Sequence, residues 1–285
     1  MNRNDDLGNR MKTYENVTRT YLTRRTPVII RIDGKAFHTF TRGFVKPFDE
    51  VLVKSMQDTM KYLCENIEGC VLGYTQSDEI TLVLCDYKKL TSQAWFDNNI
   101  QKMCSISASM TTMAFHNMLV ENHVNWCKKT ATYLANLANA DNILFENWEK
   151  QRSIYEKAFT HGAMFDSRVF NIPKEEVNNC LLWRQQDATR NSIQSVAQAN
   201  FSHKQLQNKN CLELQEMLLQ EKGINWNDIP THLKRGSCCI KEQYEIENED
   251  GNEDGVALRS RWIIDEEIPI FSQDTNYVNS RIIFE

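Results

Sequence analysis

Residues 27–40 read PVIIRIDGKAFHTF, and this stretch decides the fold. Val28 to Ile30, with Ile32, form a short apolar run rich in β-branched residues, which predicts a buried strand. Asp33 and Gly34 follow directly, and a glycine lets the main chain approach a ligand closely. A carboxylate at the end of a core strand, backed by such a loop, could hold a metal or a phosphate. On this stretch alone, an ordinary Asp-Gly turn is the simpler interpretation.

The composition is that of an ordinary globular protein. At 285 residues, the chain is long enough for one large domain or two of usual size, with a sizeable core. No window holds the roughly 18 unbroken apolar residues that a membrane-spanning helix needs. The polar N-terminus, MNRNDDLGNRMK, lacks the apolar centre of a signal peptide. We therefore expect a cytoplasmic protein without a membrane partner.

Cysteine usage and net charge narrow the function classes further. Nine cysteines without regular spacing, and without a CxxC pair, predict neither a disulfide framework nor a zinc site. They are expected to be small buried hydrophobes. The net charge of −5 argues against a uniformly basic coat for nucleic acid. A local basic groove remains compatible with it, because an acidic segment elsewhere can mask one in the sum.

The spacing of apolar residues along the first 170 positions predicts an α+β fold. Strands are indicated by short β-branched runs and helices by apolar residues three and four apart. In order, the pattern is β-α-β-β-α-β, the ferredoxin-like split βαβ arrangement. The expected elements are a helix over 7–25, a strand over 28–32, a helix over 48–67, a hairpin over 70–84, a helix over 95–119 and a strand over 163–170.

The remaining residues are expected to add helices and a C-terminal β-hairpin. Residues 174–222 have mostly helical spacing. Residues 236–246 and 256–270 predict the two strands of the hairpin. Their connection, 245–254, is rich in acidic residues and is expected to be a solvated loop.

This topology brings two distant carboxylates together. In the usual strand order, the first and third strands are antiparallel neighbours at the centre of the sheet. The end of the first strand, with Asp33, then meets the start of the third, with Asp78. Two carboxylates at one sheet edge suit a hard divalent cation such as magnesium, and two-metal sites hold their ions about 3.5–4 Å apart.

The residues next to these carboxylates have separate expected roles. Asp78 and Glu79 are consecutive on a strand and point to opposite faces unless a bulge intervenes, so Asp78 is the expected direct ligand. The carbonyl of Gly34 is a candidate third oxygen. A surface Ser-Asp-Glu turn without a metal is the alternative, since fold alone does not fix function.

Positive and hydroxyl side chains surround this edge in the sequence. Lysine and arginine there could hold a triphosphate, and Ser77 offers a hydroxyl. His38 could bind a phosphate, although a structural imidazole is the simpler interpretation. The cations and the imidazole are Lys35, His38, Arg42 and Lys46.

A third stretch, WRQQDATRNS at 183–192, could face RNA. Cations and amides are the side chains that contact RNA phosphates and bases. An amphipathic helix with an ordinary polar face explains the spacing equally well. The side chains in question are Trp183, Arg184, Arg190 and Asn191, with Lys204, Lys209, Lys234 and Arg235 further on.

Together, these motifs resemble the tRNA(His) guanylyltransferase family. The resemblance spans about residues 28–219 and implies a polymerase-type palm over 1–173, including the N-terminal helix. It also implies that 174–285, a helical tRNA-contacting region with the hairpin, packs on the palm as one unit. The matching stretches are RIDGKAFHTF at 31–40, the Lys46-Pro47 pair, GYTQSDEITLVL at 73–84, FDSRVF at 165–170, and WRQQD at 183–187 followed by Asn191.

The resemblance implies a reaction. Family members are nucleotidyltransferases that add nucleotides to the 5′ end of tRNA, in the 3′-to-5′ direction. The 5′-monophosphate is first activated with ATP, and the 3′-hydroxyl of an incoming nucleotide, typically GTP, then attacks it. The family also forms homotetramers, which we expect here.

The resemblance also implies residue roles. Asp33, the Gly34 carbonyl and Asp78 would hold two Mg2+ ions, and Glu79 would support this catalytic pair. Arg168 and Asn191 would lie near the tRNA end, where contacts from Arg184, Arg190 and Lys204 are also expected. The residues expected to bind the nucleotide are Asp33, Gly34, Lys35, Ala36, Phe37, His38, Lys46, Ser77 and Asp78.

One departure from the family pattern changes the expected substrate. Eukaryotic guanylyltransferases carry a His-Ile-Asn-Asn motif just after the WRQxD stretch. Residues 189–192 of this chain are Thr, Arg, Asn and Ser. This substitution resembles the guanylyltransferase-like branch, whose members prefer template-directed addition. Repair of tRNAs truncated at the 5′ end is therefore expected. Strict addition of one guanosine to tRNA(His), a non-catalytic tRNA-binding protein and a nucleotide cyclase are the alternatives.

Overall fold

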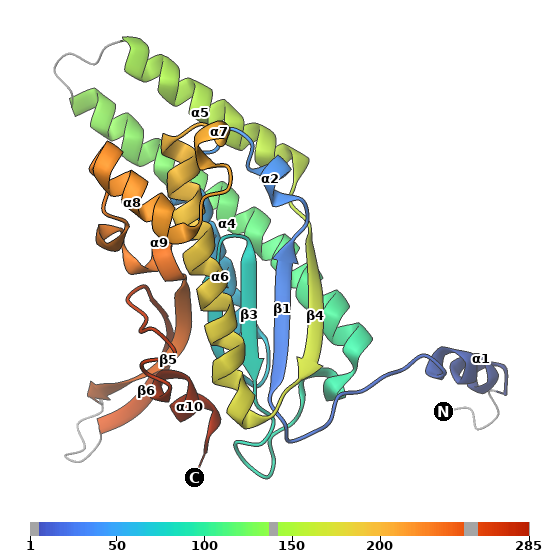
Figure 1. Cartoon of the computed structure of the whole chain (residues 1–285). Coiled ribbons are helices and arrows are strands. Elements are labelled where there is room, and N and C mark those ends of the chain that lie inside the picture. Colours follow the sequence, from blue (N-terminus) through green and yellow to red (C-terminus); the bar gives the residue numbers. More distant parts are fainter. Residues whose placement is uncertain (1–5, 137–141, 248–255, 285) are drawn as a thin grey trace.

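A single antiparallel sheet forms the centre of the molecule (Figure 1). The structure is a computed structural model that describes residues 6–136, 142–247 and 256–284. The strand order in the sheet is β4-β1-β3-β2-β5-β6. The strands are β1 (Val28–Gly34), β2 (Cys70–Gln76), β3 (Glu79–Leu84), β4 (Phe165–Asn171), β5 (Ser237–Glu247) and β6 (Val256–Asp265).

The first four strands have the ferredoxin-like order, which confirms the predicted α+β fold class. Strand β1 pairs antiparallel with both β3 and β4, and β2 pairs antiparallel with β3. In this register, Asp33 lies directly opposite Glu79 on β3. The end of the first strand and the start of the third therefore share one sheet edge.

Helices α3 (Glu50–Asn66) and α4 (Ile100–Asn136) pack on one face of the sheet. Ile30, Ile32 and Ile80 point to this face and are fully buried against the helices. Because burying an aliphatic side chain contributes about 1.5–3 kcal/mol, these central strands are firmly anchored. Helix α5 (Asn142–His161) completes the layer.

Helix α6 (Lys174–Asn200) lies on the opposite face, with the C-terminal segment beside it. Ile29 and Val83, which alternate with the residues of the first core, are buried here. The second half of α6 forms a third core with α8 (Cys211–Lys222). The shorter helices are α2 (Phe37–Phe40), α7 (His203–Leu206), α9 (Thr231–Arg235) and α10 (Asn276–Ile282), with 3₁₀ turns at Trp95–Asn98 and Trp226–Asp228.

Three expected elements have different bounds. The N-terminal helix, α1, covers only Asp6–Asn16, and none of its residues is buried. The helix expected from residue 95 begins at Ile100, after a 3₁₀ turn, and continues to Asn136. Strand β6 ends at Asp265 instead of 270, because the chain turns there toward the second core.

The C-terminal hairpin continues the palm sheet. Strand β5 pairs with β2 from Cys239 opposite Gly73 to Ser237 opposite Thr75. The sheet thus contains strands from both sides of residue 173. The division into two domains at this residue stays a prediction. Most of the acidic connection, 248–255, lies outside the described residues.

The predictions about disulfides and membrane-spanning helices can be compared with the described part of the chain. All nine cysteines lie in it and are free thiols. Among its helices, none combines the length and the apolar character that crossing a membrane requires.

Candidate active site

The β2–β3 turn and the end of β1 meet at one edge of the sheet. The turn consists of Ser77 and Asp78, between the paired residues Gln76 and Glu79. The amide of Gly34 donates to the carbonyl oxygen of Asp78 at 3.1 Å. This bond fixes the loop after Asp33 against the turn, so two carboxylates 45 positions apart in sequence become neighbours.

Burial and mutual repulsion shape the electrostatics of this pair. Burial raises the pKa of Asp78, and the negative charge of Asp33 raises it further. A hydrogen bond from the Ser77 hydroxyl to Oδ1 of Asp78, at 3.0 Å, acts in the opposite direction. Burial thus disfavours the ionised form of Asp78, and a bound cation would favour it.

This donor set fits a hard divalent cation. Of the ion pairs among the described residues, none involves Asp33 or Asp78. Two adjacent carboxylates and the Gly34 carbonyl supply the oxygen ligands that magnesium prefers. The described chain offers no cluster of three or more acidic, histidine or cysteine ligands. The site therefore fits an ion that shares its remaining positions with water and phosphate oxygens.

Glu79 lies beside this pair but is engaged elsewhere. It is buried, and its Oε1 accepts a hydrogen bond from Nε of Arg184 on α6 at 2.6 Å. Burial raises the pKa of Glu79, while Arg184 opposes the rise. Arg184 also donates to Asp187 at 2.9 Å. Glu79 thus joins the start of β3 to α6 through Arg184.

This arrangement does not favour the expected tRNA contact of Arg184. The side chain is 9% exposed, and its guanidinium is bonded to two carboxylates. Lys234, expected on an RNA-facing surface, is similarly buried, and its Nζ donates to the carbonyl oxygen of Asn227. The sequence does not reveal this burial. The Glu79 partner of Arg184 lies 105 positions away, and the carbonyl partner of Lys234 lies in a separate turn.

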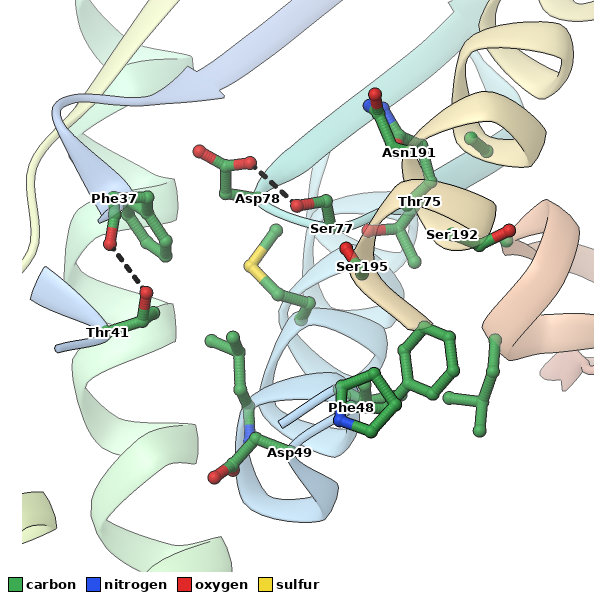
Figure 2. A pocket seen from close by; sticks show the side chains of 18 of the residues that line it. Phe37, Thr41, Phe48, Asp49, Thr75, Ser77, Asp78, Asn191, Ser192 and Ser195 are labelled. Atoms are coloured by element: carbon green, nitrogen blue, oxygen red, sulfur yellow. Dashed lines mark hydrogen bonds between the residues drawn. The ribbon is translucent and has the colours of Figure 1, made fainter. Parts of the chain in front are cut away.

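A cavity of about 520 Å³ opens beside the two carboxylates. Figure 2 shows Ser77 and Asp78 on one side of it, Phe37 and Thr41 on another, and Asn191 opposite. Seven of the nine residues expected to bind a nucleotide line the cavity, and Asp33 and Lys35 do not. The seven are Gly34, Ala36, Phe37, His38, Lys46, Ser77 and Asp78.

The loop after β1 is shaped by close packing. A Cβ atom on Gly34 would lie 2.2 Å from Cδ2 of Phe37, so only glycine fits there. Ala36 has a φ of 52°, in the left-handed region, which turns the chain into α2. Phe37 itself is buried against Phe115 and Phe165. The wall of the cavity therefore rests on the first core.

A second wall, which the sequence did not predict, comes from α6 and α9. Ala188, Ser192 and Ser195 of α6 line the cavity, as do His232 and Leu233 of α9. The small residues share one side of α6 because they are spaced three and four apart. That spacing is the signal that could have indicated a close approach.

Hydrogen bonds hold this second wall in place. Ser192 donates to the carbonyl oxygen of Lys234 at 3.2 Å and accepts from Nε1 of Trp226 at 3.1 Å. Gln57 of α3 donates to Ser237 at 3.2 Å and to Glu266 at 3.0 Å. The cavity is thus closed by segments from both halves of the chain.

The remaining predicted residues are exposed, and only some of them line the cavity. Of the exposed Lys35, His38, Arg42 and Lys46, His38 and Lys46 line it. Arg190 is exposed and pairs with Asp187, and the neighbouring Asn191 lines the cavity.

Three other expected RNA contacts do not line the cavity. Lys204 is exposed on α7. Lys209 pairs with Glu213 at 3.7 Å. Arg168 is exposed on β4 and pairs with Asp166 at 3.2 Å.

Comparisons with known proteins place this chain in a family. The family model described as tRNAHis guanylyltransferase matches residues 8–173. A bacterial tRNA(His) guanylyltransferase (Thg1)-like protein solved with ATP is 42% identical, with a TM-score of 0.77. The match covers 98% of this chain and 100% of that one.

Two further comparisons agree. A bacterial Thg1-like protein solved with GTP is 41% identical, with a TM-score of 0.72, covering 97% and 98% of the two chains. The tRNA(His) guanylyltransferase of Schizosaccharomyces pombe is 27% identical over 245 residues, covering 83% of this chain and 81% of that protein. The chain therefore belongs to the tRNA(His) guanylyltransferase family of nucleotidyltransferases, with its palm-like polymerase fold.

Proposed function

We propose that this protein is a 3′-to-5′ RNA nucleotidyltransferase that adds nucleotides to the 5′ end of tRNA. The observation that carries the proposal is the pair Asp33 and Asp78 at one sheet edge, where Asp78 lines a cavity of nucleotide size. The ATP and GTP complexes of the two bacterial relatives support a nucleotide as its occupant. ATP would activate the RNA 5′-monophosphate, and GTP is the typical incoming nucleotide.

The cavity residues have distinct roles in this proposal. Asp33, Asp78 and the Gly34 carbonyl would hold two Mg2+ ions, which supply charge neutralisation for phosphate oxygens. Lys46, at the cavity mouth, would contact phosphate. Lys35 lies outside the cavity and would reach the phosphates from the solvent side. Catalysis by such a site depends on positioning and on charge stabilisation, with little covalent work by the protein.

The RNA would approach from the exposed side of α6. Asn191 lines the cavity, its neighbour Arg190 is exposed, and both would contact the 5′ end. Arg168 is exposed and would also lie near this end, and the exposed Lys204 would contact a phosphate further along the strand. Such contacts predict an affinity that falls steeply with salt.

We further propose template-directed repair of 5′-truncated tRNA as the reaction. The support is the sequence Thr189-Arg190-Asn191-Ser192, where eukaryotic guanylyltransferases carry His-Ile-Asn-Asn. In this chain, Thr189 donates back to the carbonyl oxygen of Gln185, and Arg190 pairs with Asp187. These residues therefore offer a different set of donors to the RNA end.

One assay tests this proposal against its alternatives. A tRNA lacking its first nucleotide is incubated with ATP, magnesium and labelled nucleotides, and growth of the RNA is measured on a gel. We expect addition of the nucleotide complementary to the opposite base. Asp33→Asn and Asp78→Asn should abolish addition while leaving tRNA affinity within about twofold.

Each alternative has its own outcome in this assay. A strict tRNA(His) guanylyltransferase would add one guanosine whatever the opposite base. A non-catalytic binding protein would bind tRNA without releasing pyrophosphate, and a cyclase would convert nucleotide without RNA. Addition by either aspartate variant at the wild-type rate would overturn the proposed site. Light scattering after size-exclusion chromatography measures the mass of the protein in solution and tests the expected homotetramer.

A further inference from the structure

Two rows of like charge cross strands β1 and β4 beside the carboxylate pair. Asp33 lies directly opposite Asp166, and Arg31 lies directly opposite Arg168. Directly opposite side chains share a face of the sheet, and like charges in that position are destabilising. The arginine row lies two residues from the aspartate row, which is about 7 Å along the strand.

On β4 this face is open, whereas on β1 it is covered at Ile29, which is buried in the second core with residues of α6. Asp166 and Arg168 are about half exposed, whereas Phe165 and Val169, on the other face of β4, are buried. In Figure 1, α6 crosses in front of the sheet beside β3, and β1 and β4 lie to its right with no described helix drawn across them. We refer to the part of this face around Arg31, Asp166 and Arg168 as the strip.

The arginine row has unused capacity to bind an anion. Arg31 is half-buried on a central strand, and its Nε has no hydrogen-bond partner among the described residues. Among the ion pairs of the described chain, Arg31 takes part in none. Arg168 has one exposed ion pair with Asp166, and such pairs contribute little. A phosphate between the two guanidiniums would relieve their repulsion and form charge-assisted hydrogen bonds.

Trp183 of α6 borders the same strip. Its side chain is 48% exposed. The guanidinium carbon of Arg31 lies 5.3 Å from the ring centroid, and that of Arg184 lies 4.4 Å from it. Proteins stack unpaired nucleobases on exposed aromatic rings and on arginine guanidinium planes, and both kinds of group are present here.

We infer that this strip seats the 5′-terminal segment of the RNA substrate, with Trp183 stacking an unpaired base and Arg31 and Arg168 holding a phosphate. The inference rests on the proposed function, because it takes RNA as the substrate. A free nucleotide is disfavoured here, since the cavity that fits it contains none of these three residues. Trp183 and the two arginines thus position the RNA end beside Asp33.

The first test measures affinity for a 5′-truncated tRNA. We expect Trp183→Leu to weaken binding roughly tenfold, and Trp183→Phe to stay within about twofold, because stacking needs an aromatic ring. Affinities for ATP and GTP should stay unchanged. Tyr133→Leu removes another exposed aromatic side chain, from the far half of α4, and is the matched control.

The second test uses the salt dependence of binding. Arg168→Gln should lower the slope of log affinity against log salt by about 1, because one phosphate contact is lost. Arg31→Gln should lower the slope by a similar amount. If the Arg31 variant folds poorly, the result for Arg168→Gln, on an exposed edge strand, decides whether the inference holds. Arg259→Gln, an exposed change on β6, should leave the slope unchanged.

The outcomes separate this inference from the proposed function. If the wild-type protein extends tRNA but Trp183→Leu binds it normally, the inference is wrong and the proposed function stands. If Trp183→Leu weakens ATP or GTP binding instead, Trp183 serves the free nucleotide, and the inference is again wrong. If the wild-type protein does not extend tRNA, the proposed function fails, whatever the variants bind.

Discussion

Glu79 of β3 and Arg184 of α6 form a buried ion pair next to the carboxylate edge, with Nε and Oε1 2.6 Å apart. The two side chains are 7% and 9% exposed, respectively. Removing one partner leaves an uncompensated buried charge, whereas replacing both by apolar residues is often tolerated. The pair also fixes α6 against the sheet, where Asn191 lines the cavity.

This pair predicts a strongly non-additive double mutant. Arg184→Leu should lower the free energy of unfolding by about 3–5 kcal/mol, because it leaves the buried Glu79 carboxylate unpaired. Glu79→Leu should cost less, because Arg184 keeps its bond to Asp187, and the double variant should lose less than the sum of the two. Urea unfolding of the four proteins measures the coupling. Additive losses would contradict an energetic link between α6 and β3 through this pair.

The central sheet and its carboxylate edge followed from local patterns in the sequence. Apolar alternation around Ile32 and Ile80 marks two core strands, and the ferredoxin-like order makes them neighbours. Asp33 and Asp78 then meet because each follows or precedes one of these strands. Nothing beyond strand topology is needed for this part of the site.

The second wall of the cavity could not be predicted in this way. It depends on contacts such as Gln57 with Ser237, which are 180 positions apart and lie in segments with no shared pattern. The burial of Arg184 was missed for the same reason, since its counter-charge lies 105 positions away. The N-terminal helix shows the opposite error: it is expected to reach residue 25, yet α1 ends at Asn16 and none of its residues is buried.

Adding a single methyl group at Gly34 is expected to cause a steric clash. In Gly34→Ala the new Cβ would fall 2.2 Å from the Phe37 ring, which has no free space because it packs on Phe115 and Phe165. We expect a loss of stability of about 1–3 kcal/mol and at least tenfold weaker GTP binding. Thermal unfolding and nucleotide titration measure the two effects.

A matched glycine variant separates the clash from general backbone strain. Gly162 has a φ of 76°, and a Cβ there would meet no atom within 4 Å. Gly162→Ala should therefore cost stability through its backbone angle while leaving GTP affinity unchanged. Equal loss of GTP binding in both variants would show that the Phe37 contact is not the cause.

Asp49 both caps helix α3 and lines the cavity, so we expect its loss to affect stability and nucleotide binding together. Its buried carboxylate accepts hydrogen bonds from the amide of Leu52 at 3.0 Å, the amide of Val45 at 2.9 Å and the hydroxyl of Tyr155 at 2.7 Å. Asp49→Ala removes the cap of α3 and leaves the other two donors unpaired. We expect a loss of about 2–4 kcal/mol by urea unfolding.

The partner side of this contact gives the control. Tyr155→Phe removes one donor but leaves the Asp49 carboxylate with its two amide partners, so the loss should be only about 1 kcal/mol. GTP affinity should fall in Asp49→Ala, because Val45 and Asp49 both line the cavity. A Tyr155→Phe loss as large as that of Asp49→Ala would contradict this order.

His123 predicts a pH dependence of stability. The ring is 5% exposed and packs against Trp126, Tyr155 and Phe159. Burial lowers its pKa below the ordinary value of 6.5; nearby Glu156 opposes the shift, and Arg152 adds to it. The folded state therefore favours the neutral ring, and its unfolded counterpart takes up the proton first.

The sign of the effect follows from this difference. The stabilising contribution is complete above pH 6.5 and is lost as the pH falls from there through the lowered pKa of the folded state. His123→Phe, which keeps an apolar ring, should remove this part of the slope when melting temperature is measured between pH 5 and 8. His161→Gln, an exposed change at the end of α5, removes one histidine without touching this cluster and should keep the wild-type slope. An unchanged slope in His123→Phe would assign the acid sensitivity to another group.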